Sequence, residues 1–257
     1  MLNRLTLHYA RSLVSVFLLS ISSFQDVKKR EIDDRVWIAF IAVAVFINLA
    51  GVLTSIVEPV GWLVFAGLQS ALFILLYYAG AFGGADAKSL ICLSIMYPTC
   101  LAEFLTDLSI GRLAVPLSAF DNAIILTLVF PLFNLLWNLS MRLRGVELFK
   151  GLEKEGLHRR IAALFLLMKI SFSQYRSNSF RFALAEKYSR SGVKRIVFTK
   201  TLGEDSGSRL RDEEYVFTSF LIPLQAFILL GLVIRLLYGD ILLLLTLIIV
   251  RMLIKSF

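Results

Sequence analysis

The sequence has few of the residues that build metal sites and disulfide frameworks. Its 257 residues include two cysteines and two histidines. Cys92 and Cys100 share one apolar run without a CxxC pair, which excludes a zinc knuckle and favours structural thiols over a disulfide. His8 and His158 are too few for a metal cluster, and we expect both at an interface or in solvent. We therefore predict neither a metal nor a cofactor.

Several hydrolase and nucleotide-binding motifs are also absent. There is no HExxH motif for a zinc peptidase and no Walker-type phosphate loop. There is no Gly-x-Ser-x-Gly nucleophile paired with a histidine inside a span, and Ser206 lies in a Ser-Gly-Ser sequence typical of a turn. These absences exclude the other common hydrolytic mechanisms. Carboxylates are then the candidate catalytic groups.

Charged residues are scarce, at 18%, whereas 58% of residues are hydrophobic. Several uncharged runs approach or exceed the roughly 18–20 residues that cross a bilayer. A soluble protein with a large core would need polar helix faces, which these runs lack. The sequence predicts an α-helical polytopic protein of the cell membrane, embedded in the lipid bilayer. The first run lacks the cleavage site of a removable signal peptide, so we interpret it as a retained span.

The net charge of +8 does not indicate nucleic-acid binding, because the basic residues gather in two loops beside apolar runs. That placement marks the cytoplasmic side of a membrane protein. We therefore predict no nucleic-acid partner and an N-terminus outside the cell. The basic segment 142–214 is expected to face anionic lipid headgroups.

The apolar runs predict six transmembrane helices and a small cytoplasmic α+β insert. The expected spans cover residues 5–25, 36–57, 60–82, 87–105, 122–141 and 216–238. Residues 241–250 are too short to span alone. They continue the sixth span, form an interfacial helix or form a short seventh span. The expected domains are a membrane domain at 1–141, the soluble insert at 142–214, and the last helix with a hydrophobic segment at 215–257.

The insert has a mixed pattern. Residues 161–172 and 182–188 are expected to be helical. Residues 195–199 and 215–218 are rich in β-branched and aromatic side chains, which favours strands. Residues 203–208 are expected to form a turn.

One carboxylate lies at the end of a long apolar run, where a charge is energetically unfavourable. The chain carries no charge from Val60 to Ala85, and then Asp86 follows. An acid at the end of a membrane span is a functional hypothesis by default. Gly83 and Gly84, just before it, let the backbone turn tightly and let another chain approach closely. Asp86 follows the third span and Asp26 ends the first, so both acids are expected on the cytoplasmic face.

A close pair of carboxylates can perform acid–base hydrolysis. The two groups cannot both ionise easily, so they share a proton and supply one base and one acid at the same pH. The base takes a proton from water, while the acid polarises the scissile carbonyl and helps the amine depart. No covalent intermediate is required. Which acid starts protonated, and whether the two touch before substrate binds, stays open.

Two other interpretations of these acids were considered. Asp26 and Asp86 could bind the ion of a proton- or cation-coupled transporter, which predicts internal repeats that the sequence does not show. The protein could also be a scaffold in which the acids only cap helices. Capping is the simpler explanation for Asp33 or Asp34, which precede the second span.

The motifs resemble the GxGD-type aspartic proteases, specifically archaeal type IV prepilin peptidases and preflagellin (archaellin) peptidases. Asp26 precedes a basic loop with Ile32-Asp33-Asp34, and residues 82–88 read FGGADAK. The likeness extends to the late insert, to Leu221–Leu224 and to Tyr238–Asp240. It implies an aspartic endopeptidase in which Asp26 and Asp86 are catalytic.

The resemblance also assigns supporting residues. Gly83 matches the first motif glycine, but Ala85 stands where the family name has its second. Lys88 matches a basic residue that often follows the motif; it either orients or charge-balances Asp86, or extends to the membrane interface. The implied partner is a preflagellin or prepilin precursor, cut on the cytoplasmic side between a short positive leader and an apolar helix.

The acids Glu31, Asp33 and Asp34 could meet the positive leader of that precursor. Bacterial relatives carry a cysteine-bearing region and also methylate their product. The region is absent here, so we predict protease activity alone. The choice between archaellin and pilin, and the oligomeric state, stay open.

Overall fold

The computed structural model describes residues 3–98, 114–189, 193–198 and 213–255. It forms two compact units. Residues 1–126 and 223–257 make the first unit, and residues 127–222 make the second. The expected turn at 203–208 and Cys100 lie outside the described residues.

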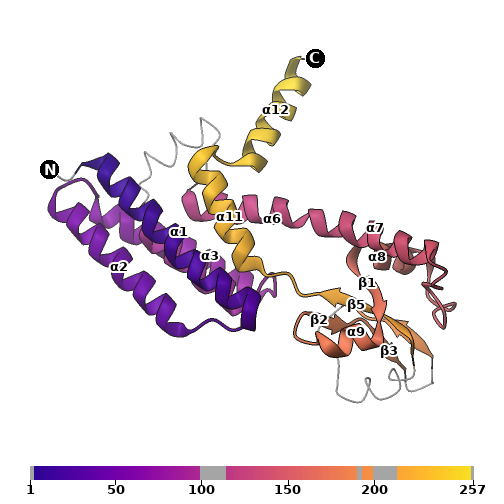
Figure 1. The fold of residues 1–257 in the computed structure, drawn as a ribbon. Coiled ribbons are helices and arrows are strands. Elements are labelled where there is room, and N and C mark those ends of the chain that lie inside the picture. The colour runs from indigo at the N-terminus through magenta and orange to yellow at the C-terminus, as the bar shows by residue number, and fades with distance from the viewer. Residues whose placement is uncertain (1–2, 99–113, 190–192, 199–212, 256–257) are drawn as a thin grey trace. The chain divides into compact units, whose positions relative to one another are not determined.

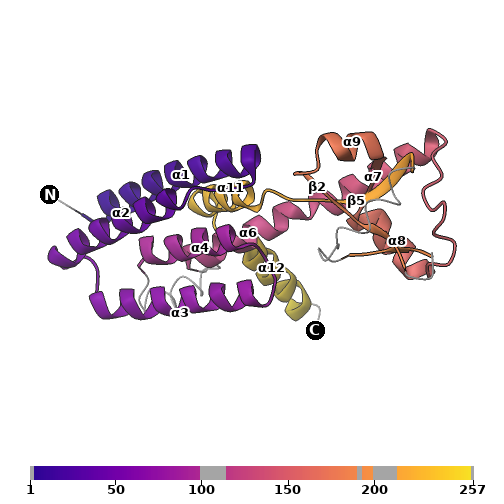
Figure 2. The same ribbon diagram turned by 90° about the horizontal axis from the view of Figure 1, so that it is seen from below.

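Helices build the first unit (Figure 1). They are α1 (Arg4–Lys29), α2 (Asp34–Leu53), α3 (Pro59–Tyr78), α4 (Gly84–Met96), α6 (Val115–Thr127, which ends at the edge of the second unit), α11 (Leu224–Leu237) and α12 (Ile241–Lys255). Figure 2 shows α4 between α3 and the pair α1 and α2. Most side chains of α4 are buried in this position, including Leu90, Cys92 and Leu93.

Capping residues fix where the early helices start. The Asp33 carboxylate accepts the N–H of Arg35 at 2.9 Å, which confirms the predicted cap of the second helix. Glu58 caps α3, and Pro59 occupies its first turn, where a missing N–H costs nothing. Their outer faces are apolar, and Leu13, Phe46 and Leu63 are exposed, as expected of helices that contact lipid.

The helices confirm a multi-pass membrane protein but not the count of six spans. In the described residues, four helices are long and apolar enough to cross a membrane: α1, α2, α3 and the continuous stretch Val115–Leu143. A fifth is reached only when α11 and α12, which bend by 57° at Gly239–Asp240, are taken as one span. Helix α4 has 13 residues, and the rest of the expected fourth span, from residue 99 onward, lies outside the described residues.

The expected start of the sixth span is wrong. Residues 216–220 belong to strand β5 (Tyr215–Phe220), and the helix begins only after Pro223. The strand pairs on both sides, with β1 (Met168–Ser171) and β2 (Phe182–Leu184), in an antiparallel sheet of order β1-β5-β2. Those hydrogen bonds, together with the fixed backbone of Pro223, separate strand from helix.

The second unit combines helices and strands, but it is longer than the insert predicted at 142–214, because it includes α7 (Val129–Leu143), which was expected in the fifth span. Its other elements are α8 (Leu157–Leu166), α9 (Phe172–Ser177), and the paired strands β3 (Glu186–Tyr188) and β4 (Lys194–Ile196).

Two helix predictions fail in this unit. The helix expected at 161–172 ends at Leu166 and is followed by β1, and residues 182–188 contain β2 and β3. The strand predicted at 215–218 is confirmed as part of β5. The strand predicted at 195–199 is confirmed only for residues 195–196, since 197–198 are not in a strand.

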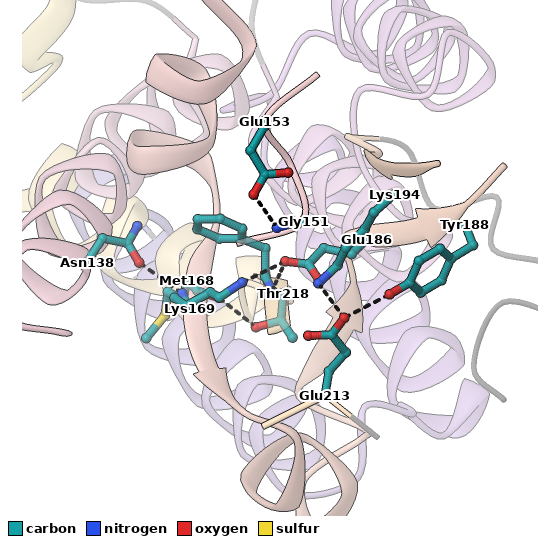
Figure 3. A network of polar contacts seen from close by, with 11 residues as sticks. Asn138, Gly151, Glu153, Met168, Lys169, Glu186, Tyr188, Lys194, Glu213 and Thr218 are labelled. Carbon is teal, nitrogen blue, oxygen red and sulfur yellow. Dashed lines mark hydrogen bonds and ion pairs between the residues drawn. The ribbon is translucent and has the colours of Figure 1, made fainter. Parts of the chain in front are cut away.

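A buried ionic network explains why 182–188 is not helical (Figure 3). Glu186 is fully buried between two lysines, with Lys169 Nζ at 2.9 Å and Lys194 Nζ at 2.8 Å. Lys194 also meets Glu213 at 3.1 Å, and the Tyr188 hydroxyl donates to Glu213 at 2.8 Å. Such long-range contacts outweigh the local helix preference of Ala-Leu-Ala-Glu-Lys.

Candidate active site

Asp26 lies in the last turn of α1. Its side chain is 15% exposed, and the Arg30 guanidinium stands 3.9 Å from Asp26 Oδ1. Arg30 ends the helix in the left-handed conformation (φ 59°), with its N–H bonded to the Asp26 carbonyl oxygen. That conformation is uncommon outside glycine. The left-handed turn at the end of α1 thus places the Arg30 guanidinium near the Asp26 carboxylate, four residues earlier.

Asp86 lies in the first turn of α4. Gly83 is the N-cap, and its N–H donates to Asp86 Oδ2 at 3.1 Å. The carboxylate therefore does cap its own helix, as the simpler interpretation expects. A cap leaves the second carboxylate oxygen available, so this role does not exclude chemistry.

Gly83 does not form the tight turn that the sequence predicts, because its φ of −78° is accessible to any residue. In the segment that joins α3 to α4, the glycine with a positive φ is Gly80, at 79°. What Gly83 provides is space, because a Cβ at this position would lie 3.2 Å from Asp86 Oδ2. A Cβ on Gly84 would meet only Tyr77, at an ordinary 3.6 Å.

Ala85 fits the site without strain. It lies within α4, does not have a positive φ, and packs against the apolar core. Alanine is the best helix former, so the departure from a second glycine is favourable to the helix rather than a defect.

A third helix, α11, packs against both α1 and α4. Gln225, in the first turn of α11, is fully buried, and its Nε2 donates to Asp86 Oδ1 at 3.1 Å. The start of α11 therefore lies beside the acid of α4. The first N–H groups of a helix lack partners inside it, so they attract an anion.

The structure thus places Asp26 of α1 and Asp86 of α4 near enough for their charges to interact, and both helices pack against α11. The charge of Asp26 acts on Asp86, and the charge of Arg30 acts on both. Two carboxylates beside one cation can hold a single shared proton, which is the arrangement that acid–base hydrolysis needs.

Lys88 forms its ion pair with Asp34 and not with Asp86, the acid that its predicted orienting role requires. Its Nζ lies 2.6 Å from Asp34 Oδ1, and both side chains are largely exposed. Lys88 therefore tethers α4 to the start of α2. Glu31, Asp33 and Asp34 are all exposed on the loop that follows Asp26, although Asp33 is engaged as a cap and Asp34 in the ion pair.

Sequence reasoning missed Gln225, the two serines bonded to it, and the pairing of Arg30. Gln225 directly follows Leu221–Leu224, which the sequence analysis had singled out. The sequence signal for Gln225 is an amide side chain in the first turn of a mostly apolar helix. Buried polar groups form hydrogen bonds, so such an amide predicts a polar partner on a neighbouring helix. Among the described residues, no group of three or more His, Cys, Asp or Glu side chains is arranged to hold a metal.

Comparison with known families gives the site a context. Residues 13–139 match the model of the type IV leader peptidase family. The chain belongs to this family. The matched range contains Asp26, Asp86, Gly83 and Lys88, whereas the late insert, Leu221–Leu224 and Tyr238–Asp240, to which the predicted resemblance extended, lie outside it. No curated protein matches the chain.

Membership in the type IV leader peptidase family supports a peptidase activity on prepilin-type precursors. It confirms the family predicted from the FGGADAK motif and does not favour a transporter. Together with the apolar helices, it describes a multi-pass membrane peptidase.

Proposed function

We propose that this leader peptidase is an aspartic endopeptidase that removes the short positive leader of preflagellin or prepilin precursors at the cytoplasmic face of the cell membrane. The observation that supports the proposal is that Asp26 and Asp86 lie near enough for their charges to interact, at the ends of helices that both pack against α11. Both acids lie at helix ends, where a span of the precursor would leave the bilayer.

The proposed chemistry uses one proton shared between the two acids. The ionised carboxylate takes a proton from the attacking water, and the protonated one donates to the carbonyl oxygen as the tetrahedral intermediate forms. As the C–N bond breaks, the carboxyl that gained the water proton gives it to the leaving amine, and the other carboxylate takes a proton from a hydroxyl of the intermediate, which restores the pair with one proton. The positive charge of Arg30, 3.9 Å from Asp26, stabilises one ionised carboxylate of the pair. The other carboxyl can then stay protonated.

The leader would lie over the loop that follows Asp26. Glu31, Asp33 and Asp34 are exposed there and supply negative charge for lysines or arginines of the precursor. Residues 27–35, which include this loop and the helix ends beside it, contain four basic residues, the pattern of a cytoplasmic segment. Charge recognition by the exposed acids would place the positive leader in water and its apolar helix in the bilayer.

The test is cleavage of purified full-length precursors by the purified chain, with the product identified by mass spectrometry. Asp26→Asn and Asp86→Asn should each abolish cleavage. Asp121→Asn is the matched control, because Asp121 lies in α6 and is a half-buried acid of the same unit.

Three results would contradict the proposal. The native chain could leave a panel of preflagellin and prepilin precursors intact. Either active-site variant could cleave at the native rate. The Asp121 control could lose activity as completely as the other two, which would indicate a general effect of removing acids rather than a catalytic pair.

A further inference from the structure

Gln225 has a hydrogen-bond arrangement that packing alone does not require. Its side chain has one acceptor and two N–H donors. Nε2 donates to Asp86 Oδ1 at 3.1 Å and to Ser89 Oγ at 3.3 Å. Oε1 lies 3.4 Å from the Ser22 hydroxyl, whose one proton is shared with the Leu19 carbonyl oxygen at 3.0 Å. Both N–H donors of this buried amide are therefore used.

These contacts hold Asp86 from two directions. The amide of Gln225 binds one carboxylate oxygen, and the N–H of Gly83 binds the other. Ser89, which accepts from Gln225, donates in turn to the Asp86 carbonyl oxygen at 2.7 Å. The side chain and the backbone of the acid are thus both fixed relative to α11.

The side chain of Gln225 also lies beside the helix that carries the other acid. Helix α11 packs against α1. Ser22 Oγ, one helical turn before Asp26 on α1, lies 3.4 Å from Gln225 Oε1. Gln225 therefore binds Asp86 directly and contacts α1 close to Asp26.

We propose that Gln225 is a positioning residue of the aspartate pair, which sets the orientation of Asp86 through its side chain and holds it relative to α1, the helix that carries Asp26. The proposal rests on the proposed function for its kinetic consequences. A misplacement of about 1 Å at reacting groups costs on the order of 100-fold in rate, so the loss of these bonds should be felt in kcat.

The first variant is Gln225→Met, which keeps the size and removes the hydrogen bonds. We expect kcat to fall roughly 10- to 100-fold by the same argument, with KM within about threefold, since Gln225 is buried and does not contact the leader. The matched control is Gln69→Met, which replaces a buried glutamine of α3 in the same unit. The control should leave kcat near its native value.

The pH profile separates positioning from a general structural effect. A hydrogen bond to a carboxylate favours its ionised form. The acidic limb of the kcat profile should therefore move to higher pH in Gln225→Met. In Gln225→Glu, activity relative to the native chain should rise as the pH falls, because the introduced carboxyl can donate like the amide only when protonated.

An infrared titration makes the test independent of cleavage. The carboxyl band that disappears in Asp86→Asn should titrate at a higher pH in Gln225→Met than in the native chain or in Gln69→Met. If the band does not move, or if kcat and its pH profile are unchanged in Gln225→Met, the positioning role is refuted. If the band moves but the native chain cleaves no precursor, the positioning stands and the proposed function fails.

Discussion

Gly83 and Gly84 are neighbours, yet alanine should lower the activity at the first position and leave it nearly unchanged at the second. A Cβ at Gly83 would lie 3.2 Å from Asp86 Oδ2, closer than almost all real Cβ contacts, so the carboxylate must shift by a few tenths of an ångström. A Cβ at Gly84 would lie 3.6 Å from Tyr77, which is ordinary contact. Gly83→Ala should therefore disturb the acid, and Gly84→Ala should not.

The magnitude follows from the bond at stake. The Gly83 N–H donates to Asp86 Oδ2 at 3.1 Å, and hydrogen bonds to charged groups contribute about 1.5–3 kcal/mol. A partial loss of about 1 kcal/mol corresponds to roughly a fivefold change in rate. We therefore expect Gly83→Ala to lower kcat about three- to tenfold and Gly84→Ala to stay within about twofold of the native value.

The assay is the initial rate of precursor cleavage in proteoliposomes over a range of precursor concentrations, so that kcat and KM are separated. Thermal unfolding of both variants controls for stability. A larger fall in kcat for Gly84→Ala than for Gly83→Ala would refute the contact argument. Equal native rates for both would show that the space beside Asp86 is not limiting.

Three further outcomes concern the charged residues. Glu186→Gln should lower the free energy of unfolding by about 3–5 kcal/mol, because it leaves two buried lysines without their shared acid. The exposed Glu214→Gln is the control and should change it by less than about 0.5 kcal/mol. Thermal or denaturant unfolding measures both. Partial burial raises the pKa of Glu213, but hydrogen bonds from the tyrosine hydroxyl and a lysine outweigh it and lower the pKa overall. The stability from this depressed pKa is present above the ordinary value of 4.5 and is lost as the pH falls below it, so Glu213→Gln should flatten the acid side of a stability–pH curve; an unchanged curve would contradict this. Lys88→Gln should leave kcat within about twofold and cost at most about 1 kcal/mol of stability, because the ion pair is exposed; a severe loss of cleavage would indicate that Lys88 serves Asp86 after all.

Local signals in the sequence were sufficient for much of the membrane unit. The cap at Asp33 and the first three helices follow from residues close together in the chain, and they appear within a few positions of the expected bounds. The shared location of Asp26 and Asp86 needed only the parity of membrane crossings. The resemblance of the FGGADAK motif then pointed to the family that the comparison confirms.

Contacts between distant segments could not be predicted. Gln225 meets Asp86 across 139 positions of sequence, and no local pattern encodes that pairing. Residues 182–188 have helix-forming composition, but their partners in β4 and β5 make them strands. Gly83 also shows this limit: its need for glycine comes from the position of a carboxylate oxygen, not from its own backbone angles.

The most direct test of the central claim is a double-mutant cycle on cleavage, with Asp26→Asn, Asp86→Asn and the double variant measured on one precursor. Groups that act as one catalytic unit give strongly non-additive losses. We predict that each single variant is as inactive as the double. A native rate in either single variant, or losses that multiply in the double, would contradict a shared-proton pair formed by Asp26 and Asp86.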